Sequence, residues 1–252
     1  MHGFSRLACC LGALALWAHG VGAQDGAEPR LIAKTYNSGF PLAHDTYNGM
    51  GVGSDGKIYY VLSSESHVTG AQVCRYDPAT DAVTILGDLT EGCGEKGKQT
   101  IAQGKAHVNF TECDGKLYFA THVGYYTLVD GMEKIGIPPR GFKPYPGGHF
   151  VAYDLRTGKF ESLALAPLGE GILTMTMDTE RKRCYALTWP TGYFIRYDLA
   201  LKELRNLGKT AREGENGAGE SYRTICRSMV VDPRDGAVYF TNGDGDILDQ
   251  VR

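Results

Sequence analysis

The 252-residue sequence predicts an all-β chain built from repeated, four-stranded antiparallel units. One observation is a turn pattern in which Asp-Gly precedes a short run of aromatic and β-branched residues. The copies, the third of which lacks the Asp-Gly pair, lie at residues 55–63, 114–122, 183–188 and 235–241. Asp-Gly favours a tight hairpin turn because glycine accepts the positive φ angles that such turns require. Each copy therefore predicts a turn that leads into a strand.

A second observation is a Tyr-Asp pair that follows three of these segments and leads into another short apolar run. The tyrosines of these pairs are Tyr76, Tyr153 and Tyr197. One unit is therefore expected to hold four short strands, joined by two tight turns and one long connection between the second and third strands. Repeats of four antiparallel strands with variable loops are typical of β-propeller blades.

We expect blades at about residues 45–89, 106–166, 171–207 and 224–252, the last of them incomplete. Residues 30–36 predict a lone strand, which could complete the last blade of a compact four-bladed ring. The preferred alternative is a larger, seven- or eight-bladed ring of which this chain is the first part, because no terminal cap pattern follows. Helix signals are nearly absent, and only residues 130–136 are expected to form a helical turn.

Residues 1–23 have the features of a secretory signal peptide, which leaves residues 24–252 as the propeller domain. Arg6 provides the positive start, residues 7–17 the apolar core, and Val-Gly-Ala at residues 21–23 the cleavage site. The protein is therefore expected to be secreted or periplasmic. A net charge of −3 excludes a general nucleic-acid footprint and gives no reason to expect a membrane surface as partner.

Five cysteines follow the predicted signal peptide, an odd number without a Cys-x-x-Cys pair. They are Cys74, Cys93, Cys113, Cys184 and Cys226. One or two disulfides and free thiols that act as small apolar residues are both compatible with this pattern.

The long connections of the predicted blades all fall at one rim, which is where binding residues concentrate on a rigid scaffold. All five histidines of the predicted mature chain belong to that rim: His44, His67, His107, His122 and His149. His107 begins one strand and His122 ends the next strand of the same hairpin, so their side chains are expected to converge. Each histidine taken alone has the simpler interpretation of a hydrogen-bonded structural residue.

Asn48 and His107 are expected at equivalent positions near the mouth of the central channel, because the first strand of a blade is the innermost one. A mouth lined by His, Asn, Tyr and Arg suits an anionic or sugar-like ligand. Further candidates at this rim are Asn109, Tyr125, Tyr126, His149, Trp189, Tyr193, Arg223 and Arg227. The histidines lack a specific metal-ligand spacing, so no cofactor is expected, with a divalent metal as the alternative.

Several catalytic motifs are missing from the sequence. It has no Gly-x-Ser-x-Gly elbow, phosphate loop, Rossmann fingerprint or His-Glu-x-x-His helix. Serine-hydrolase, nucleotide-dependent and zincin activities are therefore excluded as hypotheses.

The Asp-Gly-Lys-Leu-Tyr-Phe run at residues 114–119 and the Tyr-Asp-Leu-Arg-Thr-Gly-Lys-Phe run at residues 153–160 resemble repeats of secreted bacterial β-propellers of the YVTN, Kelch and quinoprotein-like type. The resemblance covers residues 45–252 and concerns the fold more than the function. Within that group, polysaccharide lyases such as oligogalacturonate and ulvan lyases use histidines, a tyrosine and an arginine on one face. This chain is similar to them in residue type and rim, without an aligned motif.

The resemblance to lyases implies β-elimination on a uronate polysaccharide. Arg227 or Arg223 would neutralise the carboxylate, and His107 or His122 would remove the neighbouring proton. Tyr126, Tyr125 or Tyr193 would then protonate the leaving oxygen. The competing hypothesis is a non-catalytic propeller that binds a glycan, peptide or partner protein at the same rim. A quinone-cofactor dehydrogenase ranks last, since the sequence has only two tryptophans.

Overall fold

The structure is a computed structural model that describes residues 32–242 and 247–249. The predicted signal peptide at residues 1–23 lies outside the described residues. By its contacts the chain divides after Thr35. In the first unit only residues 32–35 are described, and they form no regular secondary structure. The prediction of a strand at residues 30–36 is therefore wrong for the residues that the structure describes. All sheets of the described residues belong to the second unit.

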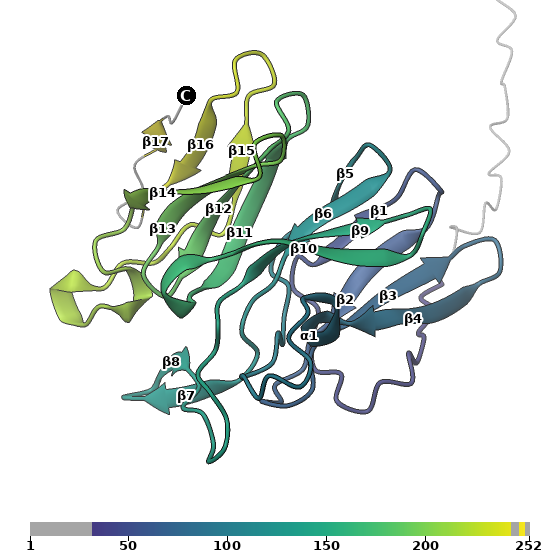
Figure 1. Ribbon diagram of the computed structural model, residues 1–252, viewed down its shortest axis with the longest axis horizontal. Helices are drawn as coiled ribbons and strands as arrows, with labels where there is room; N and C mark the ends of the chain where they lie inside the picture. Colours follow the sequence, from purple (N-terminus) through teal and green to yellow (C-terminus); the bar gives the residue numbers. More distant parts are fainter. Residues whose placement is uncertain (1–31, 243–246, 250–252) are drawn as a thin grey trace, which may run out of the picture. The chain divides into compact units, whose positions relative to one another are not determined.

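The first sheet of the second unit is a four-stranded antiparallel blade in sequence order (Figure 1). Its strands are β1 (Met50–Val52), β2 (Ile58–Leu62), β3 (Gln72–Asp77) and β4 (Ala82–Asp88). Gly56 has a φ of 75° in the turn between the first two strands, as the Asp-Gly pattern predicts. The blade ends in the single turn α1 (Leu89–Gly92), where the Asp88 carboxylate accepts hydrogen bonds from the backbone amides of Thr90 and Glu91.

The second blade carries an insertion. Its strands are β5 (Thr111–Cys113), β6 (Lys116–Ala120), β9 (His149–Asp154) and β10 (Lys159–Leu165). Between β6 and β9 the chain forms a separate hairpin of β7 (Tyr126–Val129) and β8 (Met132–Ile135). The helical turn expected at residues 130–136 is therefore wrong. Asp130 and Gly131 have φ angles of 52° and 78°, and two successive positive φ values build a tight hairpin turn instead.

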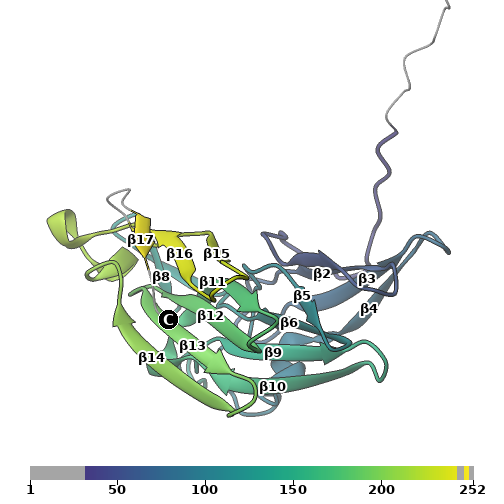
Figure 2. The ribbon, with the colours of Figure 1, turned by 90° about the horizontal axis from the view of Figure 1, so that it is seen from above.

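The third blade again has four strands, and the fourth has three within the described residues. The strands are β11 (Gly171–Asp178), β12 (Arg183–Trp189), β13 (Tyr193–Asp198), β14 (Glu203–Lys209), β15 (Met229–Val231), β16 (Val238–Thr241) and β17 (Ile247–Asp249). The connections carry the 3-10 turns η1 (Pro167–Gly169), η2 (Gly214–Asn216) and η3 (Gly219–Ser221). Figure 2 shows the four sheets following one another in sequence order. The all-β prediction is confirmed, and the sheets are propeller-like blades. Residues 32–242 and 247–249 show no closed ring, so the number of blades stays a prediction.

The repeated Tyr-Asp pair has a local structural cause. Its aspartate ends the third strand of each of the first three blades and accepts hydrogen bonds from backbone amides of the following turn. Asp154 accepts from Arg156 at 3.0 Å and from Thr157 at 2.7 Å. Asp77 and Asp198 do the same for their own turns. These carboxylates therefore specify the turn into the fourth strand, and the motif belongs to the fold.

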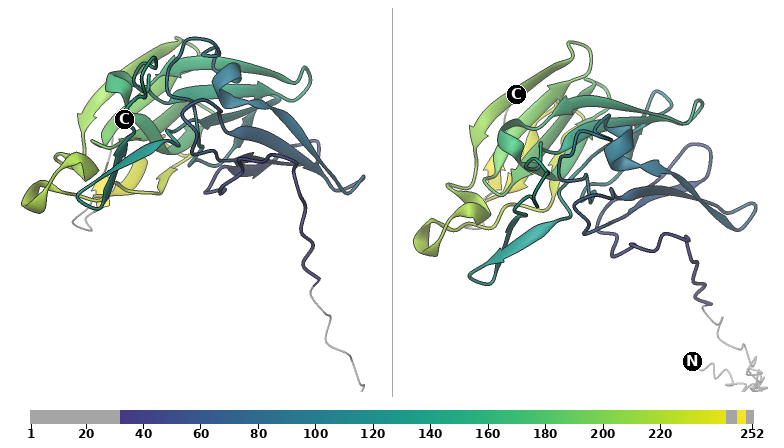
Figure 3. Two further views of the ribbon diagram at one scale, coloured as in Figure 1. Left: turned by 90° about the horizontal axis from the view of Figure 1, so that it is seen from below. Right: turned by 60° about the horizontal axis from the view of Figure 1, so that its bottom comes forward.

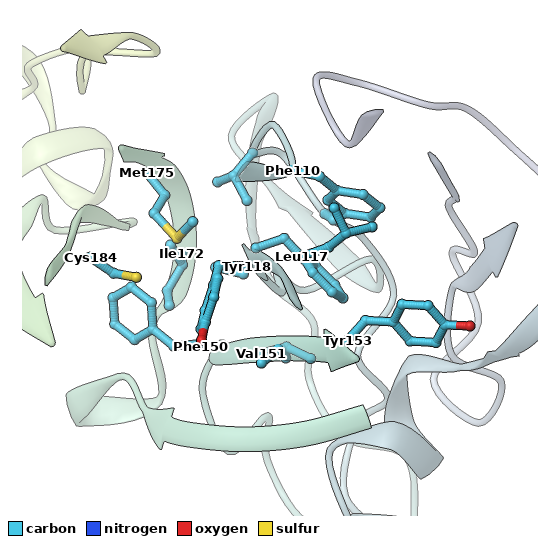
Figure 4. Close-up of a cluster of buried hydrophobic side chains, with 14 of the residues drawn as sticks. Phe110, Leu117, Tyr118, Phe150, Val151, Tyr153, Ile172, Met175 and Cys184 are labelled. Carbon is cyan, nitrogen blue, oxygen red and sulfur yellow. The ribbon is translucent and has the colours of Figure 1, made fainter. Parts of the chain in front are cut away.

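The central strand of the second blade is buried on both faces, as its sequence predicts (Figure 4). Leu117 and Phe119 are each 1% exposed, while Tyr118 on the opposite face is 7% exposed. Side chains of the neighbouring blades pack against them, including Ile172 from β11. All five cysteines within the described residues are free thiols, and four of them are buried. Their pattern fits small apolar core residues rather than disulfides.

Within residues 32–242 and 247–249, no helix has the length and apolar character needed to cross a lipid bilayer.

Candidate functional site

A cavity of about 520 Å³ opens at the rim that carries the long connections. The β7–β8 hairpin, which projects from the sheets in Figure 3, supplies part of its wall. The β14–β15 connection supplies another part. The lining residues are Tyr47, Asn48, His107, His122, Tyr126, Gly131, Met132, Glu133, Leu173, Trp189, Glu215, Tyr222 and Arg227. Six of the predicted site residues are among them, so the predicted rim does carry a cavity.

His107 and His122 converge in this cavity. Their ring centroids are 4.5 Å apart and their planes are inclined by 67°. The Tyr47 ring stacks on His107 at 4.2 Å, and the Trp189 ring meets His122 edge-on at 5.4 Å. The backbone sets this arrangement, because His122 pairs with Lys105 through hydrogen bonds in both directions, which joins the segment before β5 to the end of β6. Four aromatic rings therefore meet at one wall.

Each histidine of the pair has a buried ring nitrogen without a hydrogen-bond partner. These atoms are Nε2 of His107 and Nδ1 of His122. His122 is only 2% exposed, and Gly171 gives its ring room, since a Cβ at Gly171 would lie 2.2 Å from Nδ1. A buried polar atom without a partner costs about 1–3 kcal/mol, and both rings that carry these atoms line the cavity.

Both histidines are uncharged near neutral pH. Burial lowers the pKa of His107 to about 4, and the positive charges of Lys105 and Arg227 act in the same direction. Burial also holds the pKa of His122 well below its usual range, with further contributions from His107, Lys105 and Arg227 that outweigh the opposite effect of a backbone hydrogen bond at Ile172. A neutral imidazole offers one N–H donor and one acceptor nitrogen. The pair can therefore bind a hydroxyl group or accept a proton.

Arg227 does not face the cavity as an uncompensated charge. Its guanidinium binds Glu215 with both Nη atoms, at 2.5 and 3.0 Å. Trp189 Nε1 donates to the same carboxylate at 2.9 Å. Burial raises the pKa of Glu215, but the bonds from Arg227 and from the Ile225 amide outweigh it, so the net shift is downward. An anionic ligand would have to compete with Glu215 for Arg227.

The Tyr126 hydroxyl is also engaged, because it donates to the backbone oxygen of Val123 at 2.8 Å. Burial raises the pKa of Tyr126 strongly, with smaller contributions from nearby carboxylates such as Glu133. Its ring forms an edge-on contact with Trp189 at 5.8 Å. Tyr126 is therefore an aromatic wall whose hydroxyl already has a partner.

Sequence reasoning did not single out Lys105, Glu215 or Glu133. Lys105 is a buried lysine directly behind the histidine pair, with its side chain 3% exposed. A single lysine or glutamate in an irregular loop gives no pattern in sequence. The one available signal was the position of Lys105, two residues before His107.

His149 lies elsewhere, although it was predicted to bind ligand. It is buried in the second blade, where Nε2 lies 2.7 Å from Glu95 Oε1 and Nδ1 lies 2.7 Å from Ser162 Oγ. Both ring nitrogens therefore have partners within the protein. His149 is not among the cavity-lining residues, and its environment is that of a structural histidine.

Four further predicted ligand-binding residues are also not among the lining residues of this cavity. Asn109 is exposed ahead of β5. Tyr125 contacts the His67 ring at 5.3 Å, and Tyr193 lies under the Lys209 ammonium at 5.8 Å. Arg223 donates to the backbone oxygens of Glu220 and Tyr222. The long-loop rim is thus wider than the cavity, and rim position alone does not place a side chain in it.

One group of side chains in the described region brings three potential metal-ligand atoms within 4.8 Å of one another, namely His44, Asp45 and Glu65. The Lys105 ammonium lies 3.5 Å from the Asp45 carboxylate and 3.6 Å from the Glu65 carboxylate. The positive charge that balances these carboxylates therefore comes from the protein itself.

The chain matches no family model and no curated protein. Solved structures with a similar backbone include the extracellular domain of a protein assigned to the hybrid two-component systems of B. thetaiotaomicron, with 15% identity and a TM-score of 0.49 over 83% of this chain and 21% of that one. A nidogen/laminin complex is 9% identical with a TM-score of 0.49, over 80% of this chain and 58% of that one. TolB from Acinetobacter baumannii is 12% identical with a TM-score of 0.42, over 82% of this chain and 44% of that one.

The chain thus spans about a fifth of the length of the first of these structures. The propeller-like character of the sheets follows from their own antiparallel strand order.

Proposed function

We propose that the cavity binds a neutral, carbohydrate-like ligand. The observation that carries this proposal is the pair of neutral imidazoles of His107 and His122 in the cavity lining, set among the rings of Tyr47 and Trp189. A sugar ring has apolar C–H faces that pack on aromatic rings and hydroxyl groups that both donate and accept hydrogen bonds. Two neutral imidazoles beside aromatic walls match both properties.

The charges at the cavity favour a neutral ligand over the anionic one that the sequence also suggested. Arg227 is paired with Glu215, and Glu133 adds an uncompensated carboxylate to the lining within the described residues. A uronate would meet this negative charge and gain no free guanidinium. The predicted signal peptide supports the accompanying proposal that the protein acts outside the cytoplasm.

A uronate lyase is the second candidate, and one observation favours it. His107 is uncharged at neutral pH and has an unpartnered ring nitrogen, as a base that removes a proton requires. The other proposed roles need rearrangement, because Arg227 would have to leave Glu215 and the Tyr126 hydroxyl would have to leave Val123. Binding without catalysis therefore ranks first.

Calorimetric titration of the purified protein with a panel of neutral oligosaccharides and a matched panel of uronate oligosaccharides would test the proposal. We expect a neutral member to bind and the His107→Gln variant to bind it about tenfold more weakly, as loss of one well-placed hydrogen bond would cause. The matched control is His67→Gln, a half-buried histidine outside the cavity lining.

Ultraviolet absorbance from unsaturated product ends, followed in the same mixtures, separates the two candidates. Turnover of a uronate substrate that is lost in His107→Gln would establish the lyase. Binding only of uronates, or equal binding by wild type and His107→Gln, would contradict the neutral-sugar proposal.

A further inference from the structure

We propose that Lys105 is a positioning residue of the cavity, whose ammonium fixes the rings of Tyr47 and Tyr126 as two of the cavity walls. Its consequence for ligand affinity rests on the proposed function, whereas the placement of the rings does not.

The Lys105 ammonium lies between groups from separate segments. It is 4.8 Å from the ring centroid of Tyr47 and 5.0 Å from that of Tyr126. It also donates to the Tyr47 hydroxyl at 3.3 Å. Tyr47 precedes β1 in the first blade, whereas Tyr126 begins the inserted hairpin of the second. One cation therefore contacts aromatic rings from two segments whose strands, β1 and β7, belong to different sheets.

The burial of this lysine shows that the arrangement is specific. Lysine is almost never fully buried unless it is paired, because the ammonium loses its hydration. Lys105 is paired with two carboxylates, Asp45 and Glu65, whose side chains are 25% and 48% exposed. The lysine is thus the buried member of these ion pairs and lies against the aromatic rings, whereas the carboxylates are partly exposed to solvent.

Lys209 provides an internal comparison. Its ammonium also lies over a tyrosine ring, that of Tyr193, at 5.8 Å. Its side chain is 37% exposed and pairs with Glu213 four residues along the same segment. Lys209 is therefore an ordinary surface lysine, and neither it nor Tyr193 lines the cavity.

Lys105 also acts on the histidine pair. Its backbone binds that of His122 in both directions, and its charge opposes protonation of both rings. The groups that face His107 are the cations Lys105 and Arg227, the carboxylates Asp45 and Glu215, and the rings of Tyr47 and His122. Removal of the Lys105 charge leaves the two carboxylates with less opposition. The pKa of His107 should then rise.

Nuclear magnetic resonance of the full chain tests this with three variants: Lys105→Met removes the charge, Lys105→Arg keeps it, and Lys209→Met is the matched control. In Lys105→Met we expect the pKa of His107 to move upward from about 4, and its ring protons to lose the upfield shift caused by the stacked Tyr47 ring. Lys105→Arg should retain both properties, and Lys209→Met should be identical to wild type.

A folded Lys105→Met protein with the wild-type titration and ring shifts of His107 would overturn the proposal. If Lys105→Met does not fold, the wild type decides: an ammonium fixed beside two rings has strongly upfield-shifted ε-methylene signals, and unshifted signals would overturn the proposal. Affinity for the neutral oligosaccharide should also fall about tenfold in Lys105→Met. If the wild type binds no oligosaccharide, the proposed function fails, while the spectra of His107 still test the positioning role of Lys105.

Discussion

Two buried histidines of the second blade, His149 and His122, differ in what surrounds them. They are 6% and 2% exposed, and sequence reasoning placed both at the same rim. Both ring nitrogens of His149 have partners inside the protein, whereas Nδ1 of His122 has none. Burial alone therefore does not separate a structural histidine from a candidate ligand-binding one. The inventory of hydrogen bonds does.

The surroundings of His149 form a closed polar network. Gln103 Nε2 donates to Glu95, the carboxylate that faces His149, at 2.9 Å. The hydroxyls of Thr121 and Tyr145 both donate to Gln103 Oε1 at 2.7 Å. A network in which each member is satisfied rigidifies the packing around it. In the His107–His122 pair, in contrast, each ring has one buried nitrogen without a hydrogen-bond partner.

The largest effect should follow from His149→Leu, which removes one side of the closed network. Glu95 and Ser162 would each lose a partner inside the blade, which costs about 4 kcal/mol of unfolding free energy. Urea denaturation would measure the loss, with the half-buried His67→Leu as the control. A loss below about 1 kcal/mol would show that the network is not structural, and the contrast between the histidines would disappear.

The pH dependence of stability should distinguish the open pair. The pKa of His107 is about 4 in the folded protein, below its ordinary value near 6.5, so the unfolded chain binds more protons between these values. The contribution of His107 is therefore fully present above pH 6.5 and is lost as pH falls toward 4. It reaches at most about 3 kcal/mol.

Urea unfolding of wild type and His107→Gln from pH 7 to pH 4 isolates this contribution, because the carboxylates titrate alike in both proteins. We expect the wild type to lose more stability than the variant over this window. Parallel curves would mean that His107 is not held uncharged by its surroundings.

A smaller effect is expected from Gly171→Ala, which fills the space beside His122. The new Cβ would lie 2.2 Å from Nδ1, so the ring must move, at about 2 kcal/mol. Gly87→Ala is the matched control, since its Cβ would lie 3.0 Å from the outer edge of the Phe160 ring, which can shift. Thermal unfolding and the His122 ring signals would measure both changes. Unchanged His122 signals in Gly171→Ala would show that this glycine does not define the ring position.

The blades were predictable because their signals are local. An Asp-Gly turn and an aspartate that accepts hydrogen bonds from its own turn act within a few residues, so they are visible in sequence. Asp130-Gly131 has the same turn chemistry, but the polar and charged residues of Met-Glu-Lys-Ile after it suit a helical turn as well as a strand, so the sequence alone does not predict the β7–β8 hairpin. The convergence of His107 and His122 was predictable from their places in one hairpin.

The rest of the cavity depends on contacts between distant segments. Glu215 binds Arg227 within an irregular loop and Trp189 from the third blade, and no sequence pattern announces such a pairing. His149 was misplaced for another reason. It lies at the start of β9, and its side chain points toward Glu95. The loop lengths predicted its position along the strand but not the side of the sheet to which its side chain points.

The turns closed by Asp77, Asp154 and Asp198 have a consequence for engineering. Each is completed by its own carboxylate and draws nothing from the opposite end of the sheets. The turns are therefore specified independently of the loops at the cavity. Residues 127–134 of the inserted hairpin could be exchanged while these turns stay intact, provided that Tyr126 and Ile135, which pack against the hydrophobic core, are kept. Recognition loops can in this way be varied on one face of the chain while the turns that lead into the fourth strands remain unchanged.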